Sequence, residues 1–170
     1  MAIYARKKEG EYSVAPEGLW PAVCVDVFDL GLQETPWGPQ VKIEISWQLE
    51  ERDPATKRRY LISQRYTPSL HEKSRLRPML EAWRGRKFTK DEEREFDIEK
   101  LLGVNCQLQV IHNIKDEGRI YANVQAVVPQ SKGTLKLHPE EYVRRIDREK
   151  NYEGHANGNG HVNQDADVPF

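Results

Sequence analysis

Apolar and polar residues alternate along several short segments of the chain. Between Val41 and Leu49 every odd position is apolar and every even position is polar. Such a period of two predicts a strand with one buried and one exposed face. Other segments alternate in the same way or are rich in β-branched and aromatic residues, which is typical of strands. We therefore expect strands over residues 19–30, 41–49, 58–66, 105–113 and 119–128.

The period changes between the third and fourth of these segments. Apolar residues recur at helical spacing from Ser69, and Gly85 stands where helix C-caps often place glycine, which predicts a helix over 69–85. Pro78 should kink that helix. A short second helix is expected over 97–102.

Three strands, a helix and two strands follow one another in the order of the OB-fold. This fold is a five-stranded Greek-key barrel with a helix between strands three and four. We therefore expect a mainly β protein with an OB-fold. A generic α+β sandwich of five antiparallel strands and a helix is the alternative, because element order does not determine strand pairing.

Charge is distributed unevenly along the chain. Residues 1–150 hold 26 basic and 24 acidic residues, whereas residues 151–170 hold three acidic residues and no Lys or Arg. The last segment is also rich in Gly and Asn, a composition that cannot bury a core. We expect an OB-fold domain over 1–135, a charged helical extension over 136–150, and a disordered acidic tail over 151–170.

Two cysteines, Cys24 and Cys106, each lie inside an apolar, strand-like segment. They lack the spacing of a zinc site or a disulfide framework, so we expect buried thiols in a reducing compartment. The first twelve residues contain no signal-peptide core, and no apolar run approaches the length of a membrane span. A cytoplasmic location is expected, in an infected host if the protein is phage-encoded.

The last six residues, DADVPF, carry the clearest functional signal. They resemble the acidic C-terminal tip of bacterial single-stranded-DNA-binding proteins, which binds replication, recombination and repair enzymes. Phe170 would offer a ring to an apolar pocket, and the acidic residues would steer the tip toward basic surfaces. The resemblance implies a partner-binding role for Asp165, Asp167, Val168, Pro169 and Phe170.

The body of the chain resembles small phage-encoded single-stranded-DNA-binding proteins over residues 16–130. The similar segments are PEGLWPAVCVDVFDLGLQETPWGP, SLHEKSRL, LEAWRGR and NCQLQVIHN with YANVQAVVP. An insert around residues 85–100 departs from the compact cellular pattern. Assembly into homo-oligomers is therefore left open.

Binding single strands without sequence preference requires cations along the phosphates and aromatic faces against the bases. OB-folds use strands two and three and two hairpin loops for this purpose. The residues of suitable type at those places, which we expect to contact DNA, are Trp37, Lys42, Arg58, Arg59, Tyr60, Arg65, Tyr66, Lys115, Arg119 and Tyr121.

Three of the aromatic positions have alternative interpretations. Trp37 could stack on a base or fold back as a hydrophobic plug, and Trp47 and Trp83 fit the core better than a binding surface. The facing of strand three is open as well. If Tyr60 and Tyr66 point inward with Ile62, then Arg59 and Arg65 form the exposed pair.

Catalytic motifs are not evident in the sequence, and an acidic run at residues 91–95 fits a solvated surface better than a two-metal nuclease. We expect a protein that is not an enzyme and that needs no cofactor or metal. The competing hypothesis is an adaptor or decoy that captures host replication proteins through the tip without a primary role on DNA.

Overall fold

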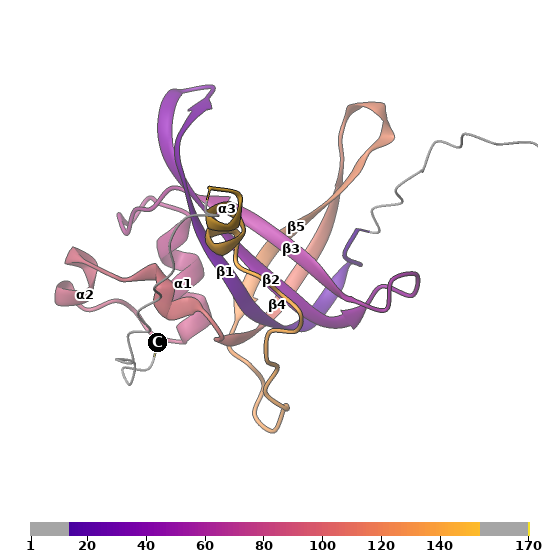
Figure 1. The fold of residues 1–170 in the computed structure, drawn as a ribbon. Coiled ribbons are helices and arrows are strands. Elements are labelled where there is room, and N and C mark those ends of the chain that lie inside the picture. The colour runs from indigo at the N-terminus through magenta and orange to yellow at the C-terminus, as the bar shows by residue number, and fades with distance from the viewer. Residues whose placement is uncertain (1–13, 154–169) are drawn as a thin grey trace, which may run out of the picture.

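The computed structural model describes residues 14–153 and Phe170, and its regular structure is mainly β (Figure 1). The strands are β1 (Gly18–Thr35), β2 (Gly38–Arg52), β3 (Arg59–Tyr66), β4 (Asn105–Ile114) and β5 (Ile120–Val128). The helices are α1 (Leu76–Arg84), α2 (Lys90–Arg94) and α3 (Arg145–Glu153), with 3-10 turns η1 (Ile98–Leu101) and η2 (Asp116–Gly118).

The five strands form one antiparallel sheet in the order β3-β2-β1-β4-β5. β1 is the longest strand and lies at the centre, where two irregularities between Cys24 and Gly31 bend it. The edges β3 and β5 approach one another, but no ladder joins them among the described residues. The sheet is open, so the closed barrel expected from the element order is not confirmed.

The core lies between the inner face of the sheet and α1. The buried face predicted for β2 is confirmed at Ile43, Ile45, Trp47 and Leu49, whereas Val41 is exposed. The polar face expected to be exposed is in part buried, because Ser46 and Gln48 lie on the outer face that residues 136–144 and α3 cover. Trp83 of α1 packs against Trp47 with ring centroids 5.9 Å apart, so both tryptophans are core residues as expected. Cys24 and Cys106 are also buried, and burial raises the pKa of the Cys24 thiol to about 12.

Helix α1 is shorter than the predicted 69–85. It begins at Leu76, which places Pro78 in the first turn, where a backbone N–H has no partner within the helix. The expected kink is therefore absent. The helix ends as predicted at Gly85, whose left-handed backbone (φ 73°) lets its N–H bond to the Glu81 carbonyl at 3.0 Å.

The charged insert folds differently from the prediction. The second expected helix, 97–102, is the 3-10 turn η1, and a short helix that was not predicted, α2, precedes it. Thr89 and Glu92 form a capping box at the start of α2.

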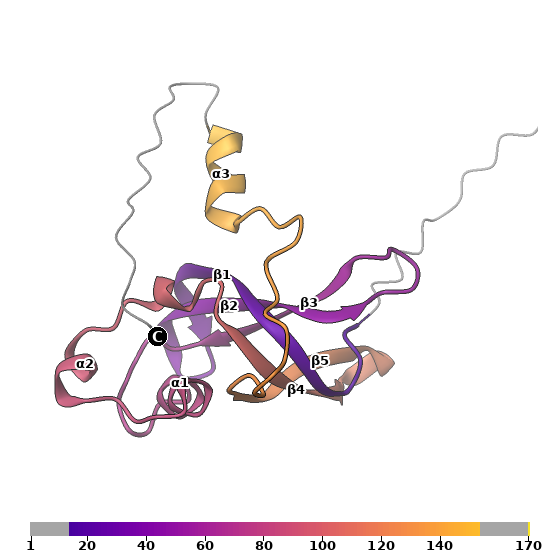
Figure 2. The same ribbon diagram turned by 90° about the horizontal axis from the view of Figure 1, so that it is seen from below.

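Residues 136–144, called the strap from here on, run across the outer face of the sheet and lead into α3. Figure 2 shows α3 on the side of the sheet opposite α1. Leu137 and Tyr142 of the strap pack on Val23 and Val25 of β1. The predicted extension 136–150 is thus helical only in its last part, and α3 extends to Glu153.

Two side-chain amides hold the strap by paired hydrogen bonds. Asn105 accepts from the Leu137 N–H at 2.7 Å and donates to its carbonyl at 2.9 Å. Gln48 does the same for Glu140, with both bonds at 2.8 Å. Each amide satisfies both backbone groups of one strap residue, so a segment without sheet pairing lies stably against the sheet.

Candidate nucleic-acid interface

The β1–β2 hairpin presents Trp37 at its tip, 85% exposed. The Thr35 hydroxyl accepts a hydrogen bond from the Trp37 N–H and donates one to the Gly38 carbonyl at 2.7 Å. This tight turn points the indole away from the body, so the plug alternative is wrong. Behind the tip, Leu32 and Val41 form an exposed cross-strand pair.

The β4–β5 hairpin carries a cation on an aromatic ring. The Lys115 ammonium lies 4.7 Å from the centroid of the Tyr121 ring, and Arg119, the residue directly before β5, is exposed. Ile114 and Ile120 are paired across the strands and are both exposed. The three residues predicted here from the sequence, Lys115, Arg119 and Tyr121, therefore share one exposed hairpin.

The two hairpins project from the body toward the same side, at the upper left and upper right of Figure 1. Each combines exposed apolar side chains with an aromatic ring, and the β4–β5 hairpin adds two cations. In the sequence the residues of the two hairpins are far apart, and in the fold both hairpins point to the same side of the body (Figure 1).

The facing of β3 is settled by burial. Ile62 and Tyr66 are buried and Tyr60 packs against the same core, so these residues point inward. Burial raises the pKa of the Tyr66 hydroxyl to about 12. Tyr66 lies in the core with no exposed ring face, and we do not retain it in the interface.

The outward positions of β3 and the neighbouring turn carry the cations, but they differ in availability. Arg58 is exposed in the β2–β3 turn, and Arg65 is exposed while it pairs with Glu44 at 3.4 Å. Lys42 of β2 is partly exposed, and its ammonium donates to the Thr67 hydroxyl at 2.7 Å. The two pairings, of Arg65 with Glu44 and of Lys42 with Thr67, lie at the surface and are weak, so phosphate groups could replace them.

Arg59 is held by the strap. Its guanidinium donates to the His138 carbonyl at 2.8 Å and lies 3.1 Å from the Glu140 carboxylate, with only 15% of the side chain exposed. Arg59 therefore has a structural role, since a contact with DNA would require it to break its interactions with His138 and Glu140.

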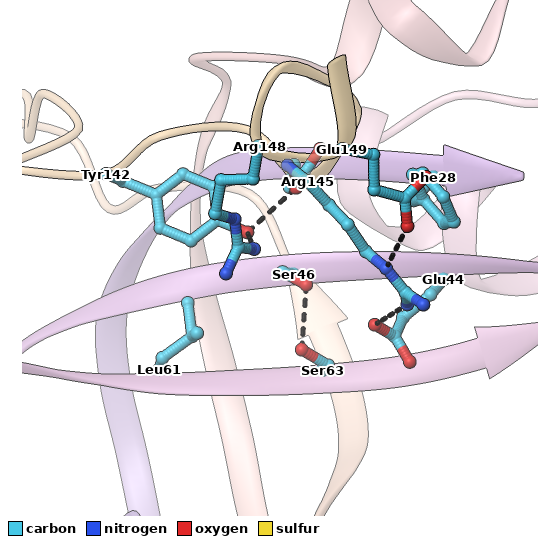
Figure 3. Close-up of a pocket in the computed structure, with 10 residues that line it drawn as sticks. Phe28, Glu44, Ser46, Leu61, Ser63, Tyr142, Arg145, Arg148 and Glu149 are labelled. Carbon is cyan, nitrogen blue, oxygen red and sulfur yellow. Dashed lines mark hydrogen bonds and ion pairs between the residues drawn. The ribbon is translucent and has the colours of Figure 1, made fainter. Parts of the chain in front are cut away.

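A pocket of about 670 Å³ lies between α3 and the outer face of the sheet (Figure 3). Its sheet side includes Phe28 and the hydroxyls of Ser46 and Ser63, which bond to each other at 2.7 Å. On the helix side, the Arg145 guanidinium lies 4.3 Å from the Phe28 ring and Arg148 lies 5.7 Å from the Tyr142 ring.

Asp26 anchors this helix side although it is buried. Its carboxylate accepts bonds from the Tyr142 hydroxyl at 2.8 Å and the Arg145 N–H at 2.9 Å, and it pairs with Arg144 at 3.3 Å. Burial and the bond to Asp26 raise the pKa of the Tyr142 hydroxyl to about 12. The Asp26 charge is thus fully compensated, which a buried carboxylate requires.

Sequence reasoning missed this pocket. Its aromatic and basic residues come from β1 and from the extension, which had been interpreted only as a charged helix. The spacing of Tyr142, Arg144, Arg145 and Arg148 within a short segment is a signal that could have suggested a basic, aromatic surface.

The predicted tip lies mostly outside the described residues. Asp165, Asp167, Val168 and Pro169 are outside the described residues, whereas Phe170 is described and packs against the core cluster.

Among residues 14–153 and 170, no three His, Cys, Asp or Glu side chains come together in a way that could hold a metal ion. No helix in the same part of the chain has the length and apolar character to cross a membrane. No protein-family model matches the chain, and a search of curated proteins finds no match either.

Proposed function

We propose that the chain binds single-stranded DNA without sequence preference and recruits partner proteins through its DADVPF tip during replication, recombination and repair. The binding surface joins the two hairpin tips with the exposed cations of β3 and the β2–β3 turn. Its residues are Trp37, Lys42, Arg58, Arg65, Lys115, Arg119 and Tyr121. Tyr60, Arg59 and Tyr66 are left out, because Tyr60 and Tyr66 point toward the core and Arg59 is held by the strap.

The observation that carries the proposal is the exposure of Trp37 on a short, hydrogen-bonded turn. A large aromatic ring without cover on a well-formed hairpin is costly to leave in water and well placed to stack on a base. Lys115 and Arg119 on the other hairpin supply the charge that follows a phosphate backbone.

The strand order of the sheet also supports the proposal. With α1 between β3 and β4 and with β3 and β5 at the two edges, the strand order is that of an OB barrel opened along one seam. In such barrels the β1–β2 and β4–β5 loops flank the bound strand. The two hairpins of this chain hold those positions in the strand order.

The adaptor hypothesis assigns partner capture to the DADVPF tip and no primary role on DNA to the hairpins, and one observation favours it, the number of aliphatic side chains on the hairpins. Leu32, Val41, Ile114 and Ile120 are exposed and could contact a protein as readily as a base. The two functions differ in whether cations on the same hairpins contribute to binding.

Binding of fluorescein-labelled oligo-dT, measured by anisotropy beside duplex DNA of equal length, tests the proposal. We expect oligo-dT to bind at much lower protein concentration than duplex. Trp37→Ala and Tyr121→Ala should each weaken oligo-dT binding by roughly 5- to 150-fold, which corresponds to about 1–3 kcal/mol per stacked base.

Leu135→Ala is the matched control, because Leu135 is equally exposed (86%) but lies in the loop after β5. It should leave oligo-dT binding unchanged. Equal affinity for the two DNA forms, or no binding, would contradict the DNA function and favour the adaptor.

A further inference from the structure

The last residue of the sequence, Phe170, contacts the body of its own chain. Its ring centroid lies 5.2 Å from that of Trp83 in an edge-on arrangement and 5.9 Å from that of Phe96. The side chain is partly buried against the core cluster. Figure 1 shows this end of the chain beside α1 and α2, away from both hairpin tips.

The surface that receives Phe170 is rigidly built. Trp83 is 2% exposed, and its indole N–H donates to the Asn105 carbonyl at 3.0 Å, which fixes the ring. Phe88 and Phe96 also belong to this surface, and their rings pack edge-on with centroids 5.2 Å apart. The capping box of α2 determines where the chain between these two phenylalanines turns.

Arg84 is a buried cation within this surface. Its side chain is 1% exposed, and one terminal nitrogen donates to Glu92 at 2.6 Å. The other two nitrogens, Nε and Nη1, have no hydrogen-bond partner among the described atoms. The guanidinium instead lies over three rings, 4.6 Å from Phe88, 5.9 Å from Phe96 and 5.6 Å from Phe170.

Glu92 pairs with only one nitrogen of this buried guanidinium, and the two nitrogens without hydrogen bonds are unfavourable unless other groups compensate them. Aromatic faces do so through their quadrupole, and more strongly when water is excluded. Phe170 is one of three such faces. The local chemistry therefore selects an aromatic ring as ligand, in preference to an aliphatic side chain of similar size.

We propose that Trp83, Arg84, Phe88 and Phe96 form a binding site for the aromatic end of the DADVPF tip, which Phe170 of the same molecule occupies. These four residues are called the Phe170 site. Its occupant is the chain's own phenylalanine because that ring lies in it, and tethering within one chain gives effective concentrations in the millimolar range.

Docking excludes the recruitment of partners by the same ring. A partner protein must compete with the Phe170 site before it can bind the tip, whereas DNA binding at the distant hairpins is unaffected. This consequence rests on the proposed function, but the docking itself does not.

A labelled DADVPF peptide tests the site by anisotropy with full-length protein, without DNA or partner. Phe170→Ala leaves the site empty, so this variant should bind the peptide. The unaltered chain should bind it roughly tenfold more weakly or worse, because its own tip competes at millimolar effective concentration. Adding Phe96→Leu to Phe170→Ala should abolish peptide binding, since it removes a ring and keeps an apolar side chain of comparable size.

Phe170→Ala combined with Trp37→Ala is the matched control and should bind the peptide as Phe170→Ala does. Circular dichroism checks that Phe96→Leu folds. Failure of Phe170→Ala to bind, or equal binding by the unaltered chain, would overturn the proposal. Dimers of the unaltered chain in sedimentation that Phe170→Ala dissociates would overturn occupation within one molecule and assign the site to a second copy.

Discussion

Trp37 and Trp83 lie in different parts of the same small fold and have opposite surroundings. Trp83 lies on the buried face of α1 beside Phe170, with 2% of its surface exposed and its N–H hydrogen bonded. Trp37 is 85% exposed at the tip of a hairpin that no other described element covers. The comparison teaches that an aromatic residue is a candidate for ligand contact only where the fold leaves its ring without a packing partner.

The largest expected effect is on stability. Trp83→Ala should lower the free energy of unfolding by roughly 3–5 kcal/mol, because it leaves a cavity against Trp47 and removes a ring from Phe170. Trp37→Ala should change it by no more than about 0.5 kcal/mol, as for other exposed positions. Urea unfolding followed by far-UV circular dichroism measures both. Similar losses of unfolding free energy in the two variants would contradict the distinction between a core and an exposed tryptophan.

A smaller effect concerns the salt dependence of DNA binding. Lys115→Ala and Arg119→Ala should each reduce the slope of log affinity against log salt by about 0.7, the value for one phosphate contact on a single strand. Lys132→Ala, which removes an exposed lysine in the loop after β5, should leave the slope unchanged. The slope is obtained from oligo-dT titrations at four salt concentrations. An unchanged slope in both hairpin variants would place the phosphate path elsewhere.

The smallest expected effect is on the pH dependence of stability, through the ion pair of Glu92 with Arg84 of α1. The hydrogen bond from Arg84 lowers the pKa of the Glu92 carboxyl to about 2. Because this pKa lies below its ordinary value of 4.5, the carboxylate stabilises the fold above about pH 4.5, and that contribution is lost as the pH falls toward 2. Between pH 5 and 2.5, Glu92→Gln should therefore lose less stability than the unaltered chain in urea unfolding. An equal loss would show that other groups dominate acid unfolding.

The sequence predicted the strands well, because each has a local pattern. The alternation within Val41–Leu49 required one buried face, and Ile43, Ile45, Trp47 and Leu49 form it. The burial of Ser46 and Gln48 on the opposite face could not be predicted from the alternation, because the residues that cover them are about 90 residues further along the chain. Whether the sheet closes into a barrel could not be predicted from such local patterns. It depends on how the irregularities of β1 bend the sheet and on α1 packing beside β5, and neither leaves a periodic signal.

The candidate site was predictable where exposure follows from a turn. Trp37, Lys115 and Tyr121 flank Gly-containing hairpins and were identified from the sequence. The engagement of Arg59 by the strap could not be predicted, because His138 is 79 residues away and charge density near a turn does not show such a partner. The Phe170 site escaped prediction for the same reason, since Trp83 and Phe170 meet only through the fold.

The Asp26 cluster has a consequence for the order of events during synthesis. The partners of this carboxylate, Tyr142 and Arg145, follow it by 116 and 119 residues. At a translation rate of about 5–20 residues per second, they emerge roughly 6–24 s after Asp26. The Asp26 carboxylate of the central strand must therefore stay hydrated while the rest of the chain is synthesised. Water can be excluded from the outer face of the sheet only when the strap and α3 pack on it, as the last step of folding.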